Sequence, residues 1–170
     1  MLKRWWVPIN NLQLEPYSIR QLGLDDLQTI ADLETRTNDY SLFMTGFLPS
    51  LENAKDLFEP EGVHVFGVFL EQSLIGILQI ITFQLENEII GLMLLDPEHR
   101  RMKLGTRVFQ AYRNWVESRG IAKTTIFVSL ENQNAIEFWL VQGFVFTSSN
   151  AEAVTFGKKT HVMQELEFEF

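Results

Sequence analysis

The sequence contains no cysteine, and it holds only three histidines among its 170 residues. The absence of cysteine excludes a disulfide framework, thiolate metal ligands and a cysteine nucleophile. The histidines are scattered and show none of the spacings that are typical of a metal site: His64, His99 and His161. We therefore expect no bound metal, and a fold that depends on a packed core.

Long apolar runs and an excess of positive charge are also missing. No apolar stretch reaches the roughly 20 residues that span a bilayer, and the N-terminal WWVPINNLQLEP is interrupted too early to form the core of a signal peptide. The formal net charge is -8, which argues against a nucleic acid as partner because that binding depends on neutralised phosphates. We expect a cytoplasmic protein that binds neither membranes nor nucleic acids.

Apolar residues are plentiful, at 46% of the chain, and a chain of this length can bury one sizeable core. We expect an N-terminal arm over residues 1–16 and a single domain over residues 17–170. Trp5 and Trp6 lie in the arm and need cover, either from their own domain or from a second subunit. These two tryptophans and the alternating final strand are compatible with a homodimer.

Hydrophobic periodicity predicts a mixed α/β (α+β) domain with the order β-α-α-β-β-β-α-β-α-β-β, about seven strands and about four helices. Strands are expected over 17–22, 63–71, 74–85, 88–96 and 123–130, with two more in the C-terminal part. Helices are expected over 24–34, 51–58, from about 103–105 to Gly120, and 133–142. Residues 35–50 mix turn formers with aromatics and are expected to form a loop. Its apolar residues either seal the core or form a wall for a substrate: Phe43, Met44, Phe47 and Leu48.

Three finer predictions concern the strands. Short connections between the middle strands require antiparallel pairing. The nearly continuous apolar run over 88–96 predicts burial on both faces. In the final strand, alternation places Val162, Leu166, Phe168 and Phe170 on one face.

One stretch, LLDPEHRRMKLGTRVF (94–109), concentrates positive charge where a strand gives way to a helix. The first turn of a helix exposes unpaired N–H groups and the positive end of the macrodipole, so it attracts anions. Arg100, Arg101 and Lys103 add charge, and Gly105 permits close approach. The pattern predicts a pyrophosphate site; taken alone, however, a basic loop before a helix is more often a solvated surface.

A second motif lies in VSLENQNAIEFWLVQGF (128–144). This segment resembles the GNAT superfamily of acetyl-coenzyme A-dependent N-acetyltransferases, whose pattern is Asn-x-x-Ala-x-x-Phe-Tyr-x-x-x-Gly-Phe. The matching residues are Asn132, Ala135, Phe138, Gly143 and Phe144.

The basic stretch is in turn similar to the coenzyme A loop of that family, Arg/Gln-x-x-Gly-x-Gly/Ala, which commonly follows a strand ending in Asp-Pro-Glu. Arg100 and Gly105 match, as do residues 96–98. The two motifs together cover about residues 88–146, and the expected element order fits the family over residues 17–170.

The resemblance implies a GNAT-like fold with a mixed, mostly antiparallel sheet, in which the fourth strand splays from the fifth. It implies acetyl-coenzyme A as cosubstrate, with the pantetheine arm beside the backbone of Met93, Leu94 and Leu95. The amides of the loop would hold the pyrophosphate: Arg101, Met102, Lys103, Leu104, Gly105 and Thr106. Asn132 would contact the pantetheine, and Ala135, Phe138 and Trp139 would line the exit side.

The sequence departs from the family at three positions. Lys103 replaces the first glycine of the loop, which is costly if a positive φ is needed there. Trp139 stands where the family usually has a tyrosine proposed to protonate the thiolate, and an indole N–H cannot act as that acid. Ile89 occupies the position of the glutamate that serves some members as general base.

Candidates for proton chemistry therefore stay open. Glu88 faces the other way in a regular strand, so it is a base only if a bulge turns it inward; otherwise it is a solvated hairpin end. Asp39 and Tyr40 are alternatives that would meet the acceptor, and Tyr112 is expected in the core. A backbone amide of the fourth strand, at Leu95, is the candidate donor to the thioester carbonyl.

Three functions follow. The leading hypothesis is an enzyme that moves an acetyl group from acetyl-coenzyme A to a primary amine of a small molecule or a protein N-terminus, because an acidic surface suits a cationic acceptor. The second is a non-catalytic acyl-coenzyme A-binding module or sensor, motivated by Trp139 and Ile89. The third, acetylation of charged tRNA, conflicts with the acidic balance.

Overall fold

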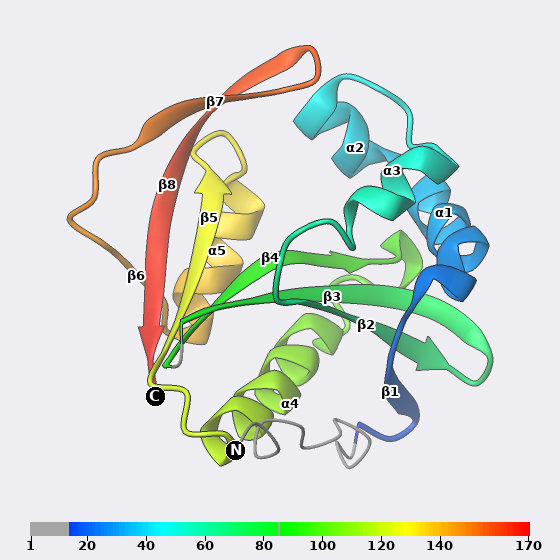
Figure 1. Ribbon diagram of the computed structural model, residues 1–170, viewed down its shortest axis with the longest axis horizontal. Coiled ribbons are helices and arrows are strands. Elements are labelled where there is room, and N and C mark those ends of the chain that lie inside the picture. The colour runs from blue at the N-terminus through cyan, green and yellow to red at the C-terminus, as the bar shows by residue number, and fades with distance from the viewer. Residues whose placement is uncertain (1–13, 85) are drawn as a thin grey trace.

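The computed structural model describes residues 14–84 and 86–170, so the predictions for Trp5 and Trp6 lie outside the described residues (Figure 1). The described chain forms one sheet of eight strands: β1 Tyr17–Gln21, β2 Val63–Leu70, β3 Ser73–Gln84, β4 Asn87–Leu95, β5 Lys123–Ser129, β6 Val145–Phe146, β7 Glu152–Phe156 and β8 Lys159–Glu169. Five α-helices and two short 3₁₀ segments accompany it: η2 Leu24–Asp26, α1 Leu27–Arg36, α2 Asn38–Thr45, α3 Leu51–Asp56, η3 Pro97–His99, α4 Leu104–Ser118 and α5 Gln133–Gln142.

The strand pairing confirms the mixed, mostly antiparallel sheet. Strands β1 to β4 pair antiparallel in chain order, as their short connections require. Helix α4 carries the chain across to β5, which pairs parallel with β4 over Asn87 to Ile89 and then diverges from it. β5 pairs antiparallel with β8, which also binds β6 and β7. The predicted splay between the fourth and fifth strands is therefore present.

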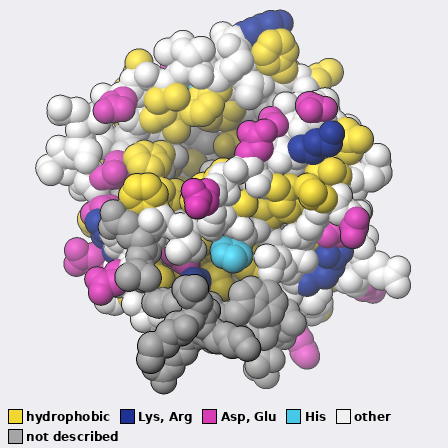
Figure 2. All heavy atoms as spheres, in the orientation of Figure 1, with side chains coloured by type: hydrophobic (Ala, Val, Ile, Leu, Met, Phe, Trp, Pro, Cys, Tyr) yellow, Lys and Arg dark blue, Asp and Glu magenta, His cyan; other side chains and the backbone are white. Residues whose placement is uncertain are grey.

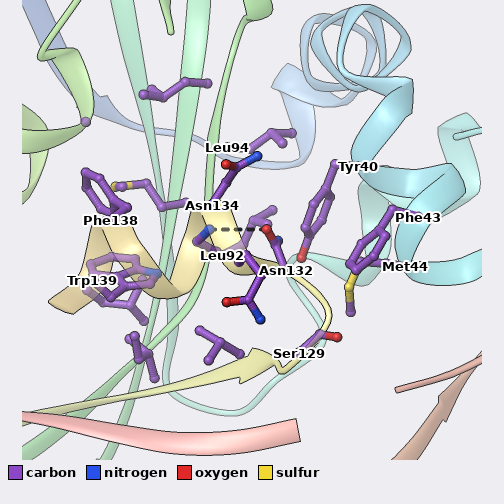
Figure 3. Close-up of a pocket in the computed structure, with 18 of the residues that line it drawn as sticks. Tyr40, Phe43, Met44, Leu92, Leu94, Ser129, Asn132, Asn134, Phe138 and Trp139 are labelled. Carbon is purple, nitrogen blue, oxygen red and sulfur yellow. Dashed lines mark hydrogen bonds between the residues drawn. The ribbon is translucent and has the colours of Figure 1, made fainter. Parts of the chain in front are cut away.

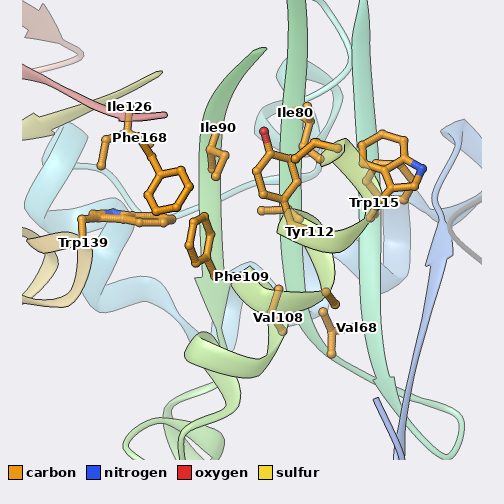
Figure 4. Close-up of a cluster of buried hydrophobic side chains, with 14 of the residues drawn as sticks. Val68, Ile80, Ile90, Val108, Phe109, Tyr112, Trp115, Ile126, Trp139 and Phe168 are labelled. Atoms are coloured by element: carbon orange, nitrogen blue, oxygen red, sulfur yellow. The ribbon is translucent and has the colours of Figure 1, made fainter. Parts of the chain in front are cut away.

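Two cores lie on opposite faces of the sheet, because β2 and β3 are apolar on both sides. Phe66 and Leu78 contribute to the core under α4 and α5, whereas Val65 and Ile77 contribute to the core under α1 and α3. In Figure 4 the side chains of α4 lie among those of the strands, as the helical period predicted. The buried residues of that helix include Leu104, Val108, Phe109, Tyr112, Trp115 and Val116.

Three expectations about local structure were wrong. Residues 35–50 contain helix α2, which ends at Gly46 with φ +74°. β4 is buried on both faces only in part, since Gly91 is exposed and Leu92 and Met93 are half-buried where β5 has separated from it. In β8, Leu166 and Phe168 are buried as expected, but Val162 is 42% exposed and the neighbouring His161 is 2% exposed.

The N-terminal segment joins the domain before residue 17. Leu14 is buried in the core under α4, and its backbone forms a bridge with Tyr17. Arg107 of α4 donates hydrogen bonds to the carbonyls of Leu14 and Glu15, at 3.0 and 2.6 Å. In the part of the chain that the structure describes, no helix is both long and apolar enough to cross a membrane.

A buried ion pair fastens β4 to the end of α4. The carboxylate of Glu88, with no exposed surface, accepts a hydrogen bond of 2.6 Å from Arg119, whose side chain is 5% exposed. Glu88 also accepts bonds from the hydroxyls of Thr82 and Tyr112, both at 3.3 Å. The guanidinium of Arg119 lies over the Trp115 ring, 4.1 Å from its centroid. The carboxylate thus has three hydrogen-bond donors, as a buried charge requires, whereas the buried Nε of Arg119 has no hydrogen-bond partner.

The first prediction concerns this pair. Replacing Glu88→Ala leaves the charge of Arg119 buried without its counter-ion, so we expect the free energy of unfolding to fall by about 3–5 kcal/mol. Glu117→Ala is the matched control, because it breaks the exposed pair with Arg113 and should cost less than about 1 kcal/mol. Urea unfolding of both variants measures the difference; equal losses would contradict a stabilising role for the buried pair.

The second prediction concerns Glu34 on α1, whose Oε2 is buried and has no hydrogen-bond partner. Burial, with a smaller contribution from Asp56, raises the pKa of Glu34 from 4.5 to about 7. The folded chain therefore holds this proton more tightly than the unfolded chain, and stability falls as the pH rises between those two values. Glu34→Gln should raise the free energy of unfolding by about 1 kcal/mol at pH 8 and change it little at pH 4. Denaturation at both pH values tests this, and an equal shift at both would contradict it.

Candidate active site

A cavity of about 910 Å³ opens where β4 and β5 diverge. Its walls come from α2, from the second half of β4, from the loop before α4, and from the ends of β5 and α5 (Figure 3). Figure 2 shows hydrophobic side chains gathered around a hollow on this face, with acidic side chains close by. A concave, largely apolar site with a few polar groups is the usual form of a small-molecule site.

Beyond Ile89 the backbone of β4 faces this cavity without a partner strand, although the carbonyl of Leu95 accepts a hydrogen bond from Arg100. Pairing with β5 ends at Ile89, so within the described chain the sheet does not use the backbone groups of residues 91–95 on that side. Met93, Leu94 and Leu95 line the cavity, as the sequence predicted. An extended ligand can bind such an edge by completing its hydrogen bonds, in the manner of an added strand.

A β-bulge at Gly91 shapes this edge. Gln79 pairs with Leu92 and Ile80 pairs with Ile90, which leaves Gly91 as the extra residue of β4. A Cβ at Gly91 would collide with the side chain of Gln79. The glycine therefore allows the strand to bend where it begins to line the cavity, and the sequence pattern gave no sign of this bulge.

The loop before α4 adopts left-handed backbone at two non-glycine residues, Arg101 with φ +61° and Lys103 with φ +60°. Such conformations cost about 1–2 kcal/mol each and occur mainly where a site requires them. They turn successive amides toward one side and form a concavity that suits an anion. Lys103 therefore keeps the positive φ that a glycine would supply more easily.

Helix α4 begins directly after this loop. Lys103 occupies the N-cap position, but its side chain makes no capping bond. The first amides of the helix, including those of Gly105 and Thr106, have no partner within it. A Cβ on Gly105 would lie 3.1 Å from the ring of Phe138, so the glycine lets the start of α4 lie close against α5. Gly105, Thr106 and Phe138 all line the cavity.

Arg100 has a different role from the predicted phosphate contact. Its guanidinium donates to both carboxylate oxygens of Asp39, at 2.7 and 3.2 Å, and its Nε donates to the carbonyl of Leu95 at 2.9 Å. The hydrogen bond from Arg100 lowers the pKa of Asp39. The side chain thus ties α2 to the end of β4, while Arg101 and Lys103 are the exposed cations of the loop.

A second ion pair holds the end of β4 to α1. Arg36 donates to Asp96 at 2.7 Å and to the carbonyl of Leu74 at 2.8 Å. Asp96 also accepts the amide of Glu98 at 3.0 Å. Burial would raise the pKa of Asp96, but the hydrogen bonds from Arg36 and the Glu98 amide hold it below its usual value. The Asp-Pro-Glu turn is therefore fixed at the point where the loop begins.

Helix α5 presents its first turn to the cavity. The side chain of Asn132 caps the helix by accepting the amide of Ala135 at 3.2 Å (Figure 3). Trp139 lies one turn further on, 7% exposed, with its ring against Phe109 and Phe144 at centroid distances of 5.8 and 5.0 Å. Trp139 is thus a core residue whose edge also lines the cavity.

The structure brings most of the predicted binding residues to one cavity. Those that line it are Met93, Leu94, Leu95, Arg100, Arg101, Lys103, Gly105, Thr106, Asn132, Ala135, Phe138 and Trp139. The side chains of Met102 and Leu104 do not: Met102 is 61% exposed, and Leu104 is buried in the core. For Met102 and Leu104, the predicted contact with a ligand is therefore one made by the backbone amide and not by the side chain.

Glu88 does not belong to the site, which corrects its choice as a base. Its side chain is buried among Arg119, Tyr112 and Thr82 and does not line the cavity. It is also not a solvated hairpin end. The pairing of β3 with β4 is irregular at Gly91 and again at Phe83, opposite Glu88, but neither irregularity turns the carboxylate into the cavity.

The opposite wall comes from α2 and from the ends of β5 and β8. Tyr40, Phe43 and Met44 of α2 line it together with Ser129 and Met163. The side chain of Tyr40 extends into the cavity (Figure 3), and burial raises its pKa, so its hydroxyl stays protonated. The sequence had pointed to Asp39 and Tyr40 as contacts of the acceptor and to Phe43 and Met44 as either core or a substrate wall, but Ser129 and Met163 were missed. The signal for Phe43 and Met44 was the unusually apolar composition of residues 40–48.

No group of three histidine, aspartate or glutamate side chains among the described residues is arranged to hold a metal ion. The polar groups of the cavity are instead backbone amides, amide side chains, hydroxyls, the paired charges of Asp39 and Arg100, and the charged side chains of Arg101, Lys103 and Glu131. This arrangement can bind an anion at the start of α4 and an extended chain along β4.

The architecture matches solved structures at low sequence identity. The ribosomal-protein-S18-alanine N-acetyltransferase from Escherichia coli superposes with a TM-score of 0.71 at 17% identity, over 90% of this chain and 93% of that chain. Spermidine N-acetyltransferase from Vibrio cholerae, in complex with CoA and spermine, superposes with a TM-score of 0.71 at 17% identity, over 90% of this chain and 95% of that chain. PaiA N-acetyltransferase from Thermoplasma acidophilum, in complex with coenzyme A, superposes with a TM-score of 0.69 at 16% identity, over 91% of this chain and 99% of that chain.

These likenesses establish the fold, and the sequence itself establishes the family. No curated protein matches the sequence significantly. The model of the Acetyltransferase (GNAT) family, however, matches residues 26–144, a segment that includes α1 to α5, the basic loop and the Asn132 motif. The chain therefore belongs to the GNAT family of acetyltransferases.

Proposed function

We propose that the protein transfers an acetyl group from acetyl-coenzyme A to a primary amine. The observation that carries this proposal is the continuity of three features in one cavity: the unpaired edge of β4, the left-handed loop before α4, and the apolar wall of α2. The first two suit a pantetheine arm that ends in a pyrophosphate, and the third suits an acceptor.

The described residues fit coenzyme A at both of its recognition points. The amides from Arg101 to Thr106 meet an anion at a helix start, with Lys103 and Arg101 adding charge. The backbone of Met93 to Leu95 is available to the amide groups of the pantetheine. The amide of Leu95 is the proposed donor to the thioester carbonyl, where negative charge develops during attack.

The acceptor wall supports an amine with an apolar body. Tyr40, Phe43 and Met44 give apolar contact, while Glu131 brings negative charge to the same cavity. The net charge of -8 favours the approach of a cation. Two solved neighbours are named for amine acceptors, spermidine and the alanine of a ribosomal protein. We therefore propose a primary amine of a small molecule or of a protein N-terminus.

A non-catalytic acyl-coenzyme A-binding module is the second candidate function. Two observations favour it: Trp139 is packed in the core where a proton donor was sought, and Glu88 is committed to Arg119. Neither affects the binding of coenzyme A. Turnover therefore separates the two candidates.

The third prediction tests the pyrophosphate site with Lys103→Glu. A carboxylate near the start of α4 complements the helix macrodipole, so thermal stability should be kept or raised slightly. The same carboxylate repels a pyrophosphate and removes a cation, so the Kd for acetyl-coenzyme A should rise at least about tenfold. Calorimetric titration and thermal unfolding measure the two effects.

Lys55→Glu is the matched control for that experiment. Lys55 is an exposed cation on α3 and does not line the cavity, so the same change in net charge should leave the Kd within about twofold of wild type. An unchanged Kd in Lys103→Glu would place the pyrophosphate elsewhere.

The fourth prediction tests acetyl transfer itself. Purified protein with acetyl-coenzyme A should release free thiol in the presence of a panel that includes polyamines, arylalkylamines and peptides with free N-termini. The apolar wall predicts that amines with an aromatic or branched aliphatic body give a higher kcat/KM than compact polycations of similar charge. Tight binding of acetyl-coenzyme A without thiol release for any amine would favour the binding module.

A further inference from the structure

A buried histidine lies behind the acceptor wall, on a strand that none of the family motifs includes. His161 of β8 is 2% exposed, and its ring forms two hydrogen bonds of 3.1 Å: Nε2 with the carbonyl of Met44, and Nδ1 with the hydroxyl of Ser129. A carbonyl oxygen only accepts, so Nε2 carries the hydrogen. In the neutral ring Nδ1 is then an acceptor, and Ser129 donates its proton to it.

The hydroxyl of Ser129 has one acceptor position left. It donates to His161, and one of its two lone pairs accepts the amide of Glu131 at 3.2 Å. Ser129 lines the cavity at the end of β5, and in Figure 3 it lies below Met44 with its hydroxyl directed toward the side of α2. The remaining lone pair is therefore available to an N–H of a molecule bound against the α2 wall.

The surroundings of His161 close the ring off from solvent. Aromatic rings of α2 and β7 lie against it, Phe43 at 4.9 Å and Phe156 at 6.4 Å between centroids. The carboxylate of Glu131 lies 3.8 Å from Nδ1, so an acidic group is present beside an imidazolium formed during the reaction. Since the ring has almost no exposed surface, Ser129 is the hydrogen-bonded route by which a proton can reach it from the cavity.

Other ionisable groups on the neighbouring elements have different partners or directions. Asp39 of α2 is paired with Arg100, and Tyr40 extends into the cavity. Glu152 of β7 is exposed, and the ammonium of Lys158 lies over the Phe47 ring at 4.4 Å. Within 4 Å of the His161 ring, Glu131 is the charged group among the described residues.

We propose that Ser129 and His161 form a proton relay that receives the proton of the acceptor amine, an inference that rests on the proposed acetyl transfer. As the amine nitrogen bonds to the thioester carbon, it becomes positively charged and acidic. Its proton passes to Ser129 Oγ while the proton of Ser129 passes to His161 Nδ1, which leaves a neutral serine and an imidazolium.

The remaining steps balance the reaction. The C–S bond breaks, the electron pair leaves with the sulfur, and the amide is released. The proton on His161 returns through Ser129 to the thiolate or to water, which restores the neutral ring. No group on β4 or at position 139 is then needed for proton transfer.

Two variants distinguish a role of Ser129 and His161 in proton transfer from a purely structural role. Ser129→Ala removes the route, while His161→Asn keeps a side-chain oxygen that can accept the serine hydroxyl but cannot take up a proton. His64→Gln is the control, because His64 is a half-buried histidine of β2 that does not line the cavity. Thermal unfolding establishes that each variant is folded.

Kinetics are measured with the amine that wild type acetylates fastest. In both relay variants we expect the Kd for acetyl-coenzyme A to stay within about twofold, kcat to fall at least about 100-fold, and the limb of the kcat/KM profile between about pH 5 and 8 to disappear. His64→Gln should match wild type. An active wild type whose relay variants keep kcat and the pH profile overturns the relay alone, whereas a wild type that acetylates no amine overturns the proposed function and the relay's role with it.

A spectroscopic measurement does not depend on turnover. In protein labelled with ¹⁵N-histidine, the signal of His161 is the one that disappears in His161→Asn. We expect the Nε2–H tautomer, with an Nδ1 shift that changes in Ser129→Ala. An Nδ1–H tautomer would overturn the relay, because the ring would then have no lone pair for the proton of Ser129.

Discussion

The candidate site depends on the point at which β4 and β5 stop pairing. Strands in one sheet normally continue to pair, because unpaired backbone groups lose hydrogen bonds. Here pairing ends at Ile89, and the two strands are held apart by contacts on opposite sides. The end of β4 is tied to α1 and α2 by the Asp96–Arg36 and Arg100–Asp39 pairs, while β5 stays paired with β8 along its whole length. These contacts keep the two strands apart, and the cavity lies where the strands diverge.

Local patterns predicted the parts of the fold whose side chains enter the cores. The stripe of α4 and the apolar runs of β2 and β3 carry a clear period because one or both faces are buried. Helix α2 was missed because residues 35–50 also contain turn formers, although Tyr40, Phe43 and Met44 follow the i, i+3, i+4 spacing of one helix face. In the structure that face lines the cavity, and Tyr40 also packs against the core under α1 and α3.

Contacts between distant segments were beyond prediction from one sequence. Glu88 looked like a solvated hairpin end or a base, and its burial depends on Arg119, 31 residues later. Ser129 and His161 are 32 residues apart, and they meet because β5 and β8 pair antiparallel near Ser129 and Met163. Most of the motif residues from Arg100 to Phe138 line one cavity, because each motif is short and its geometry is local. The proposed proton relay could not be read from a motif, because it depends on tertiary pairing.

The proposed relay gives a physical reason why this chain can have Ile89 where some family members have a glutamate, and Trp139 where the family usually has a tyrosine. A phenol at position 139 would lie in the core under α4 and α5, where the chain instead has an indole packed against Phe109 and Phe144. Ile89 belongs to neither of the two cores. Ser129 lies at the end of β5 next to the α2 wall, the side from which an amine would attack. Moving the proton acceptor to β8 leaves position 139 free to fill the core. In this arrangement His161 is held by the carbonyl of Met44, so α2 both contacts the acceptor and fixes the tautomer on which proton transfer depends.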